Sequence, residues 1–202
     1  MNDVNRPLHL CARRILRLVL MFPLYCLGHF RVLNRDQLPQ RRESRIIVCN
    51  HAALVDSIYF LVAMRPRFTV CGAKPRYFKT PLRRTLMRLI NVLPVEGKEK
   101  FLKDCRSLLR AGETLLIYPE MGRFPDGLGP FQTWAAHVAI ENQVTLRTCY
   151  LYGTTKGHHG HPKLVVGPEL EPRGNPETLT DRLRKEILTL EQMTSNPSET
   201  CR

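Results

Sequence analysis

The stretch Arg45-Ile-Ile-Val-Cys-Asn-His51 predicts a buried β-strand that ends in polar side chains. Its four apolar residues are rich in β-branching and are bounded by a charge and an amide, which is typical of a strand inside a sheet. The next apolar segment, residues 56–64, has the pattern of a helix, and residues 68–73 again favour a strand. Strands that alternate with helices predict an α/β fold with a mostly parallel or mixed sheet flanked by helices.

The rest of the chain continues this alternation and contains no internal repeat or long linker. We therefore predict a single folded domain over residues 34–192, preceded by a basic and apolar segment over 1–33 and followed by a flexible tail over 193–202. The further elements expected are helices over 81–90, 98–111, 133–141 and from Asn175 onward, strands over 114–118, 144–152 and 164–166, and a short extended piece over 92–95.

The N-terminal segment combines arginines with an apolar run. Arg13, Arg14 and Arg17 precede the apolar residues 18–27, and no small-x-small cleavage site follows them. The run is shorter than the roughly 20 residues that span a bilayer, and Pro23 would bend a helix there. We expect a helix that associates with a membrane surface, with its arginines at the headgroups. The alternative is a first helix packed on the domain's own core.

The charge of the chain is unevenly placed. The protein has 31 Lys and Arg against 18 Asp and Glu, and its first 110 residues carry +15 whereas the remaining residues carry −2. Such asymmetry indicates an anionic partner, which could be a nucleic acid, an anionic bilayer or a phosphorylated small molecule. The aromatic residues lie mostly within apolar runs rather than among the basic ones, which counts against nucleic acid.

The cysteines and histidines do not suggest a metal centre. The seven cysteines have irregular spacing without a Cys-x-x-Cys motif, which favours reduced, buried thiols. The cluster Gly157-His-His-Gly-His161 is expected to be a solvated loop, because no acid or cysteine accompanies it. Trp134 is expected to be a core anchor or the wall of a groove.

His51 and Asp56 form the first candidate site. His51 follows the predicted strand 46–49, at the edge where α/β sheets place their ligands. A histidine there can act as a general base if a carboxylate fixes its tautomer, and Asp56 is the nearby acid. A continuous helix would place the two side chains about 140° apart, so the segment between them must turn. The alternative makes Asp56 a helix N-cap and His51 a solvent-facing loop residue.

The second candidate site is Tyr118-Pro-Glu-Met-Gly-Arg123, which follows the predicted strand 114–118. Gly122 would allow a close backbone approach or a positive φ, and Arg123 offers a planar fork for a phosphate or carboxylate. Glu120 would hold Arg123 in place or bind an acceptor hydroxyl. The alternative is a salt-bridged turn without a ligand.

Together, the two blocks resemble those of the glycerophospholipid acyltransferase family, which includes the lysophosphatidate and glycerol-3-phosphate acyltransferases. The His-x4-Asp block is matched by His51 and Asp56, and the Glu-Gly-Thr-Arg block is matched in spacing by residues 120–123. The resemblance covers roughly residues 15–170. The chain departs from the family at Met121-Gly122, where Gly-Thr is usual, and at residues 144–148, where two prolines are absent. The family's middle block corresponds either to residues 74–81 or to residues 92–98.

The resemblance implies a membrane-associated enzyme, with His51 as the general base oriented by Asp56. It would move an acyl group directly from acyl-CoA or acyl carrier protein to a lysophospholipid hydroxyl, at the cytoplasmic face of the inner or plasma membrane, without a metal or other cofactor. A helix N-terminus near Asp56 would supply the oxyanion donors. Two alternatives remain: a non-glycerol lyso-lipid acceptor, and a non-catalytic basic protein that binds membranes. The residues expected to bind substrate are Glu120, Gly122, Arg123, Lys74, Arg76 and Lys79.

Overall fold

A computed structural model of the chain describes residues 6–38, 44–64, 68–155 and 161–195. Within these ranges, seven strands form one sheet in the order β1-β7-β6-β2-β5-β3-β4. Neighbouring strands are parallel except for the antiparallel pair β6 and β7. The predicted mostly parallel or mixed sheet is therefore confirmed. The strands are β1 (Arg31–Leu33), β2 (Ile46–Cys49), β3 (Phe68–Ala73), β4 (Val92–Pro94), β5 (Thr114–Ile117), β6 (Leu146–Tyr152) and β7 (Lys163–Leu170).

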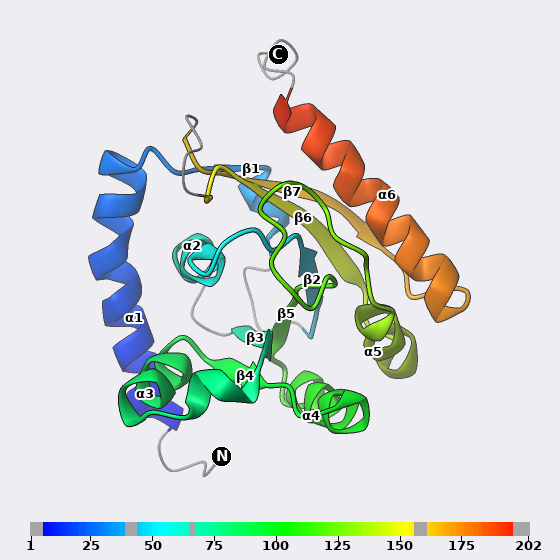
Figure 1. Cartoon of the computed structure of the whole chain (residues 1–202), viewed down its shortest axis with the longest axis horizontal. Helices are drawn as coiled ribbons and strands as arrows, with labels where there is room; N and C mark the ends of the chain where they lie inside the picture. Colours follow the sequence, from blue (N-terminus) through cyan, green and yellow to red (C-terminus); the bar gives the residue numbers. More distant parts are fainter. Residues whose placement is uncertain (1–5, 39–43, 65–67, 156–160, 196–202) are drawn as a thin grey trace.

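Helices cover both faces of this sheet (Figure 1). Three of them, α1, α2 and α3, lie on one side, and α4, α5 and α6 lie on the other. Short helical turns, η2 (Pro23–Leu27), η3 (Arg35–Gln37) and η4 (Pro75–Phe78), connect the elements. The α-helices are α1 (Arg6–Phe22), α2 (Asp56–Ala63), α3 (Pro81–Leu89), α4 (Lys98–Arg110), α5 (Trp134–Asn142) and α6 (Pro176–Ser195).

Strand β2 lies inside the sheet because it is apolar on both faces. Ile46 and Val48 pack in the hydrophobic cluster formed with α4, α5 and α6, whereas Ile47 and Cys49 pack in the cluster on the opposite face with α2. Successive side chains of a strand point to opposite faces, and a strand covered on both sides is expected to read as a continuous apolar run. The uninterrupted Ile-Ile-Val-Cys pattern therefore follows from a central position between β5 and β6.

Helix α1 packs on the domain through one of its sides. Its partly buried Leu16 and Leu20 contact the core beside α2. The buried Arg13 donates to the Phe68 carbonyl at 2.9 Å, and Arg17 donates to the Val62 carbonyl at 3.2 Å. Burial lowers the pKa of Arg13 to about 10, and the charge of Glu113 opposes that shift. This arrangement matches the alternative reading of the N-terminal segment, a first helix that packs on the core.

The chain after α1 joins the sheet. Pro23 begins the π-helical turn η2, and β1 then pairs in parallel with β7. Strand β1 was not predicted, because Arg31-Val-Leu33 is too short to show a strand pattern. Strand β7 extends well beyond the predicted 164–166. Within the ranges that the structure describes, no helix is both long enough and apolar enough to cross a bilayer.

The remaining predicted elements agree with the structure to within a few residues. Asn175 caps α6, because its Oδ1 accepts the Thr178 N–H at 2.8 Å. Trp134 packs against Phe101 with ring centroids 5.2 Å apart, as a core anchor would. The six cysteines within the described residues are free, and four of them are buried. Helix α6 continues to Ser195, and the rest of the predicted tail lies outside the described residues.

Candidate active site

The site lies at the carboxyl edge of β2, where Asn50 joins this strand to β6. The Asn50 side chain donates to the Leu151 carbonyl at 3.0 Å and accepts the Leu151 N–H at 2.7 Å. The regular pairing of β2 with β6 ends at Cys49, and the Asn50 side chain continues the contact with the β6 backbone beyond that point. The next residue, His51, therefore begins its turn from a fixed position.

His51 and Asp56 meet although they are five residues apart. The His51 Nδ1 lies 2.9 Å from the Asp56 Oδ2, and the backbone N–H groups of Ala52 and Ala53 donate to the same oxygen, each at 2.9 Å. These contacts curl residues 51–55 around the carboxylate before α2 begins. Val55 occupies the N-cap position of α2 without a side-chain cap bond. Asp56 is therefore not the N-cap of α2; it is a buried carboxylate, only 1 % exposed, that orients an imidazole.

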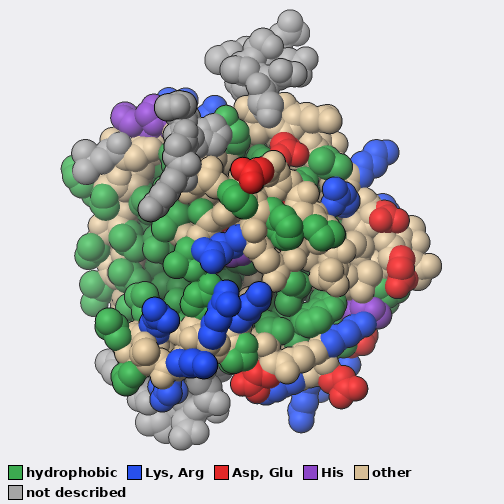
Figure 2. All heavy atoms as spheres, in the orientation of Figure 1, with side chains coloured by type: hydrophobic (Ala, Val, Ile, Leu, Met, Phe, Trp, Pro, Cys, Tyr) green, Lys and Arg blue, Asp and Glu red, His purple; other side chains and the backbone are tan. Residues whose placement is uncertain are grey.

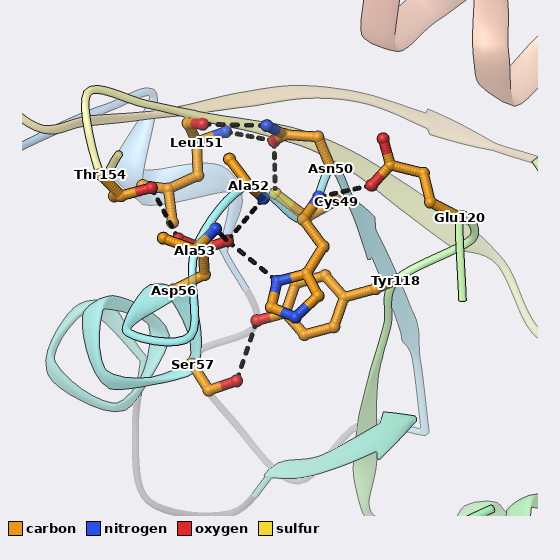
Figure 3. Close-up of polar contacts among 11 residues, drawn as sticks. Cys49, Asn50, Ala52, Ala53, Asp56, Ser57, Tyr118, Glu120, Leu151 and Thr154 are labelled. Carbon is orange, nitrogen blue, oxygen red and sulfur yellow. Dashed lines mark hydrogen bonds and ion pairs between the residues drawn. The ribbon is translucent and has the colours of Figure 1, made fainter. Parts of the chain in front are cut away.

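A fourth donor to Asp56 comes from another part of the chain. The Thr154 hydroxyl donates to the Asp56 Oδ1 at 2.6 Å (Figure 3), whereas the imidazole contacts the other carboxylate oxygen, Oδ2. Thr154 lies just beyond β6, at the edge of the sheet where β2 also ends. The sequence analysis missed this residue. A threonine after a strand does not indicate a site by itself. Its role becomes visible only when the parallel pairing of β2 and β6 brings it next to Asp56.

Tyr118 lies directly against the imidazole. The rings of His51 and Tyr118 are stacked, with centroids 4.1 Å apart and planes 15° apart. The Tyr118 hydroxyl forms a hydrogen bond of 3.1 Å with the Ser57 hydroxyl. Burial, followed by the charge of Asp56, raises the pKa of Tyr118 well above its usual value, so the phenol is neutral. Tyr118 and Ser57 were not among the predicted site residues.

Glu120 supports the backbone of the site. Its Oε2 accepts the His51 N–H at 2.6 Å, and its Oε1 accepts the Gly129 N–H at 2.9 Å (Figure 3 shows the bond to His51). Burial raises the pKa of Glu120 to about 7, although both backbone donors oppose that shift. The described contacts thus join Glu120 to backbone N–H groups, whereas the sequence suggested a bond to Arg123 or to a substrate hydroxyl.

The turn after Glu120 differs from the expected one. Met121, rather than Gly122, has the left-handed φ of 51°. Gly122 lies close to Phe124, since a β-carbon built on it would be 3.3 Å from the Phe124 Cε2. Phe124 donates its backbone N–H to the His51 carbonyl at 2.8 Å, which ties the two motif blocks together. Gly129 is the tighter position, since its β-carbon would lie 2.4 Å from the Phe124 ring.

A cavity of about 530 Å³ opens beside His51 and is apolar on one side and basic on the other. Arg123 donates to the Tyr77 hydroxyl at 3.4 Å, and the Arg76 guanidinium lies over the Tyr77 ring, 5.3 Å from its centroid. Nearby Arg76, followed by the charges of Arg123 and Lys74, lowers the pKa of Tyr77. The lining residues include His51, Ser57, Tyr118, Met121, Gly122 and Arg123, the cationic Lys74 and Arg76 with Tyr77, and the apolar Leu54, Val55, Ile58, Val70, Leu86, Met87, Ile90 and Val92.

Most of the residues predicted to bind substrate meet at this cavity. Lys74, Arg76, Gly122 and Arg123 line it, whereas Lys79 is exposed and is not one of its lining residues. Of the two segments considered for the middle block, 74–81 contributes the cations. Lys98, from the other segment, lies elsewhere, with its Nζ 3.3 Å from the His137 Nε2. The cavity thus combines an imidazole, a cationic wall and an apolar interior.

Of the histidine cluster, only His161 lies within the described residues, and it is not one of the residues that line the cavity. His161 packs against His29, with ring centroids 4.6 Å apart, and His158 and His159 lie outside the described residues. Among the residues that the structure describes, no three His, Cys, Asp or Glu side chains gather in a way that could hold a metal ion.

Comparisons with known proteins point to one family. Residues 29–152 match the family model described as Acyltransferase. A chloroplastic 1-acyl-sn-glycerol-3-phosphate acyltransferase of Arabidopsis thaliana is 27 % identical over 180 residues, covering 82 % of this chain and 49 % of the relative. The enzyme of the same name from Cocos nucifera is 30 % identical over 116 residues, covering 54 % of this chain and 37 % of the relative. The chain thus spans half or less of the length of these relatives.

A solved structure shows the same fold. The crystal structure of the 1-acyl-sn-glycerophosphate acyltransferase of Thermotoga maritima superimposes with a TM-score of 0.67 at 18 % identity. The match covers 93 % of this chain and 85 % of the other. The arrangement of the sheet and its flanking helices is therefore shared far beyond the two short motifs.

Proposed function

Because this chain belongs to the acyltransferase family, we propose that it transfers a fatty acyl group from a thioester to the hydroxyl of a lysophospholipid such as 1-acyl-glycerol-3-phosphate. The observation that carries the proposal is the cavity, in which His51, backed by the buried Asp56, shares the lining with cationic and apolar side chains. The acyl donor is acyl-CoA or acyl carrier protein. The family and its relatives support the reaction class, and the cavity supports an amphipathic, anionic acceptor.

His51 is the proposed general base. Because its Nδ1 is directed at Asp56, its Nε2 remains to take the proton of the acceptor hydroxyl. The hydroxyl oxygen attacks the thioester carbonyl, the C–S bond breaks, and the proton passes from the imidazolium to the departing thiolate. The Asp56 charge stabilises the imidazolium formed on the way. No acyl-enzyme is required, since the acceptor oxygen attacks directly.

The oxyanion formed in this attack needs hydrogen-bond donors. The sequence suggested a helix N-terminus near Asp56, yet the N–H groups of Ala52 and Ala53 already donate to that carboxylate. We place the donor on the hydroxyls of Ser57 and Tyr118, which both line the cavity beside the imidazole. Only one of the two hydroxyl protons lies between the Ser57 and Tyr118 oxygens, so the second hydroxyl proton can be donated to the oxyanion.

The cationic wall is the proposed site for the acceptor's phosphate. Arg123, Lys74 and Arg76 line the cavity from two different loops, and the bond between Arg123 and the Tyr77 hydroxyl holds the guanidinium in place. A guanidinium fork binds phosphate oxygens in pairs. A phosphate held at this wall would orient the acceptor's hydroxyl toward His51, and this positioning would lower the activation barrier. The apolar side chains of α2, α3 and β4 would accommodate the acyl chain.

Membrane association is the second part of the proposal. On the outer side of α1, the side chains of Ile15, Leu18, Val19 and Phe22 are 63–66 % exposed. Leu82 on α3 is 81 % exposed. Figure 2 shows an apolar surface on this side of the molecule, next to Lys and Arg side chains over η4 and α3. An apolar surface edged by cations suits the interface of an anionic bilayer, from which a lysophospholipid could enter the cavity.

The test of the reaction is acyl transfer by the purified protein. Thiol release from acyl-CoA is measured with 1-acyl-glycerol-3-phosphate as acceptor. Parallel assays use lyso-aminolipids as acceptors and, as a control, an acceptor that contains no glycerol. We expect transfer to the phosphorylated acceptor and its loss in His51→Ala. Transfer that persists in His51→Ala rules out the assigned base. Vesicle binding without transfer to any acceptor instead supports the non-catalytic membrane protein.

The membrane part is tested separately with vesicles that contain anionic lipid. Replacing Leu18 and Phe22 with serine should lower the fraction of protein that floats with the vesicles, because both side chains are exposed and contribute apolar area. Met193→Ser is the matched control, since Met193 is 53 % exposed on α6, across the sheet from α1. Equal loss of binding in the control contradicts the assignment of this surface.

A further inference from the structure

Thr154 holds the carboxylate that orients the proposed base. We propose that Thr154 is a positioning residue for acyl transfer: its hydroxyl fixes the Asp56 carboxylate so that one oxygen stays directed at His51. This inference rests on the proposed function, in which His51 removes the proton of the acceptor hydroxyl. It assigns a role to a residue outside both sequence motifs.

The backbone after β6 brings Thr154 to the carboxylate. Strand β6 ends at Tyr152, and Gly153 then adopts a left-handed φ of 78°. A β-carbon on Gly153 would lie 3.2 Å from the His161 carbonyl oxygen, so both the conformation and the space favour glycine. The turn at Gly153 places Thr154 beside Asp56, 98 residues away in sequence, with a hydrogen bond of 2.6 Å.

The two oxygens of Asp56 have different partners. Oδ2 accepts from the His51 ring and from the N–H groups of Ala52 and Ala53, whereas the described donor to Oδ1 is the Thr154 hydroxyl. Asp56 is 1 % exposed, so bulk water does not replace a missing donor. A buried, ionised oxygen without a donor is strongly unfavourable. Without Thr154, the carboxylate would turn to share its remaining donors, and Oδ2 would leave its position opposite the imidazole.

Thr154 acts through Asp56 and not through the substrate. It is not one of the residues that line the cavity, whereas His51 and Ser57 are. Its loss should therefore lower kcat with little effect on KM for the acceptor. A residue with a general structural role would instead lower the amount of folded enzyme, which leaves the kcat of the folded fraction unchanged.

The experiment compares three variants with the wild-type protein in the acyl-transfer assay. Thr154→Val keeps the shape and removes the hydroxyl, Thr154→Ser restores a hydroxyl, and Thr155→Val is the matched control at the next residue. We expect kcat to fall about 10- to 100-fold in Thr154→Val, with KM within about twofold, and to return to within about threefold of wild type in Thr154→Ser. Thr155→Val should keep wild-type kcat. Active-site concentrations are normalised to the folded fraction measured by thermal unfolding.

A second readout does not depend on substrate. The proton between the His51 Nδ1 and Asp56 should give a low-field proton NMR signal, identified by its absence in His51→Gln. We expect this signal to shift or broaden in Thr154→Val and to be restored in Thr154→Ser. An unchanged signal in Thr154→Val overturns the positioning role, even if the wild-type protein transfers no acyl group. An active wild type with unchanged kcat in Thr154→Val overturns it as well, while leaving the proposed function intact.

Discussion

Replacing Asp56 with asparagine should separate the charge of the site from its shape. The amide oxygen of Asn can occupy the position of Oδ2 and accept from the His51 ring and from the N–H groups of Ala52 and Ala53. The amide nitrogen then faces Thr154, whose hydroxyl can rotate and accept a hydrogen bond. All four contacts of the side chain can thus be kept, and what is lost is the negative charge beside the imidazolium.

The magnitude follows from that charge. Two unit charges about 4 Å apart interact by about 4 kcal/mol at an effective dielectric constant of about 20. The imidazolium and the carboxylate, whose nearest atoms are 2.9 Å apart, lie in this range. A barrier raised by that amount slows the reaction about 1000-fold. Because Asp56 and His51 are largely buried, added salt should change the ratio of wild-type to variant rates very little.

The assay is kcat/KM for thiol release from acyl-CoA, with the phosphorylated acceptor below saturation. Thermal unfolding of Asp56→Asn should stay within a few degrees of wild type if the hydrogen bonds are kept. The control is Asp126→Asn, the same chemical change at an exposed residue in the loop after β5. A folded Asp56→Asn protein with more than a tenth of wild-type kcat/KM would refute the claim that the Asp56 charge stabilises an imidazolium during the reaction.

Three further predictions concern the second motif block and the loop that follows it. Gly129→Ala should destabilise the fold by about 1–3 kcal/mol, because its β-carbon would overlap the Phe124 ring. Gly122→Ala, with a contact of 3.3 Å, should lower the thermal unfolding midpoint much less, and equal midpoints would contradict this reading. Because the pKa of Glu120 is raised to about 7 in the folded protein, the stability that its proton contributes is present near pH 4.5 and is lost as the pH rises to about 7. The unfolding midpoint of the wild type should therefore exceed that of Glu120→Gln by less and less across this range. A constant difference would argue against a buried, titrating carboxyl. Arg123→Ala should raise KM for the phosphorylated acceptor at least tenfold and leave KM for acyl-CoA nearly unchanged. An equal rise in both KM values would mean that Arg123 does not bind the acceptor's phosphate.

The sequence alone predicted the fold class because its strands are strongly apolar and its helices are periodic. The run Ile46–Cys49 requires burial on both faces, and parallel neighbours with covering helices are the usual way to provide it. Local signals of this kind do not depend on distant residues. The strand β1 and the full length of β7 escaped prediction because their pairing, rather than their own composition, makes them strands.

The two motif blocks were likewise visible in the sequence, since His51 and Asp56, and residues 120–123, match the spacing of the family's two motifs. Their partners were not. Thr154 and Tyr118 contact the site only because β6, β2 and β5 end at the same edge of the sheet. Glu120 accepts from the backbone N–H groups of His51 and Gly129, which no local pattern could predict, whereas Arg123 contacts Tyr77.

The residues that can carry the chemistry were thus evident from composition and spacing, because ionisable and cationic groups are properties of individual side chains. The tertiary structure decided how these groups are held. Hydrogen bonds and ring contacts act over a few ångströms, and only the folded sheet brings residues 51, 56, 118 and 154 within that distance. It also decided that α1 packs on the core with one side and leaves its other apolar side exposed, which its composition alone left open.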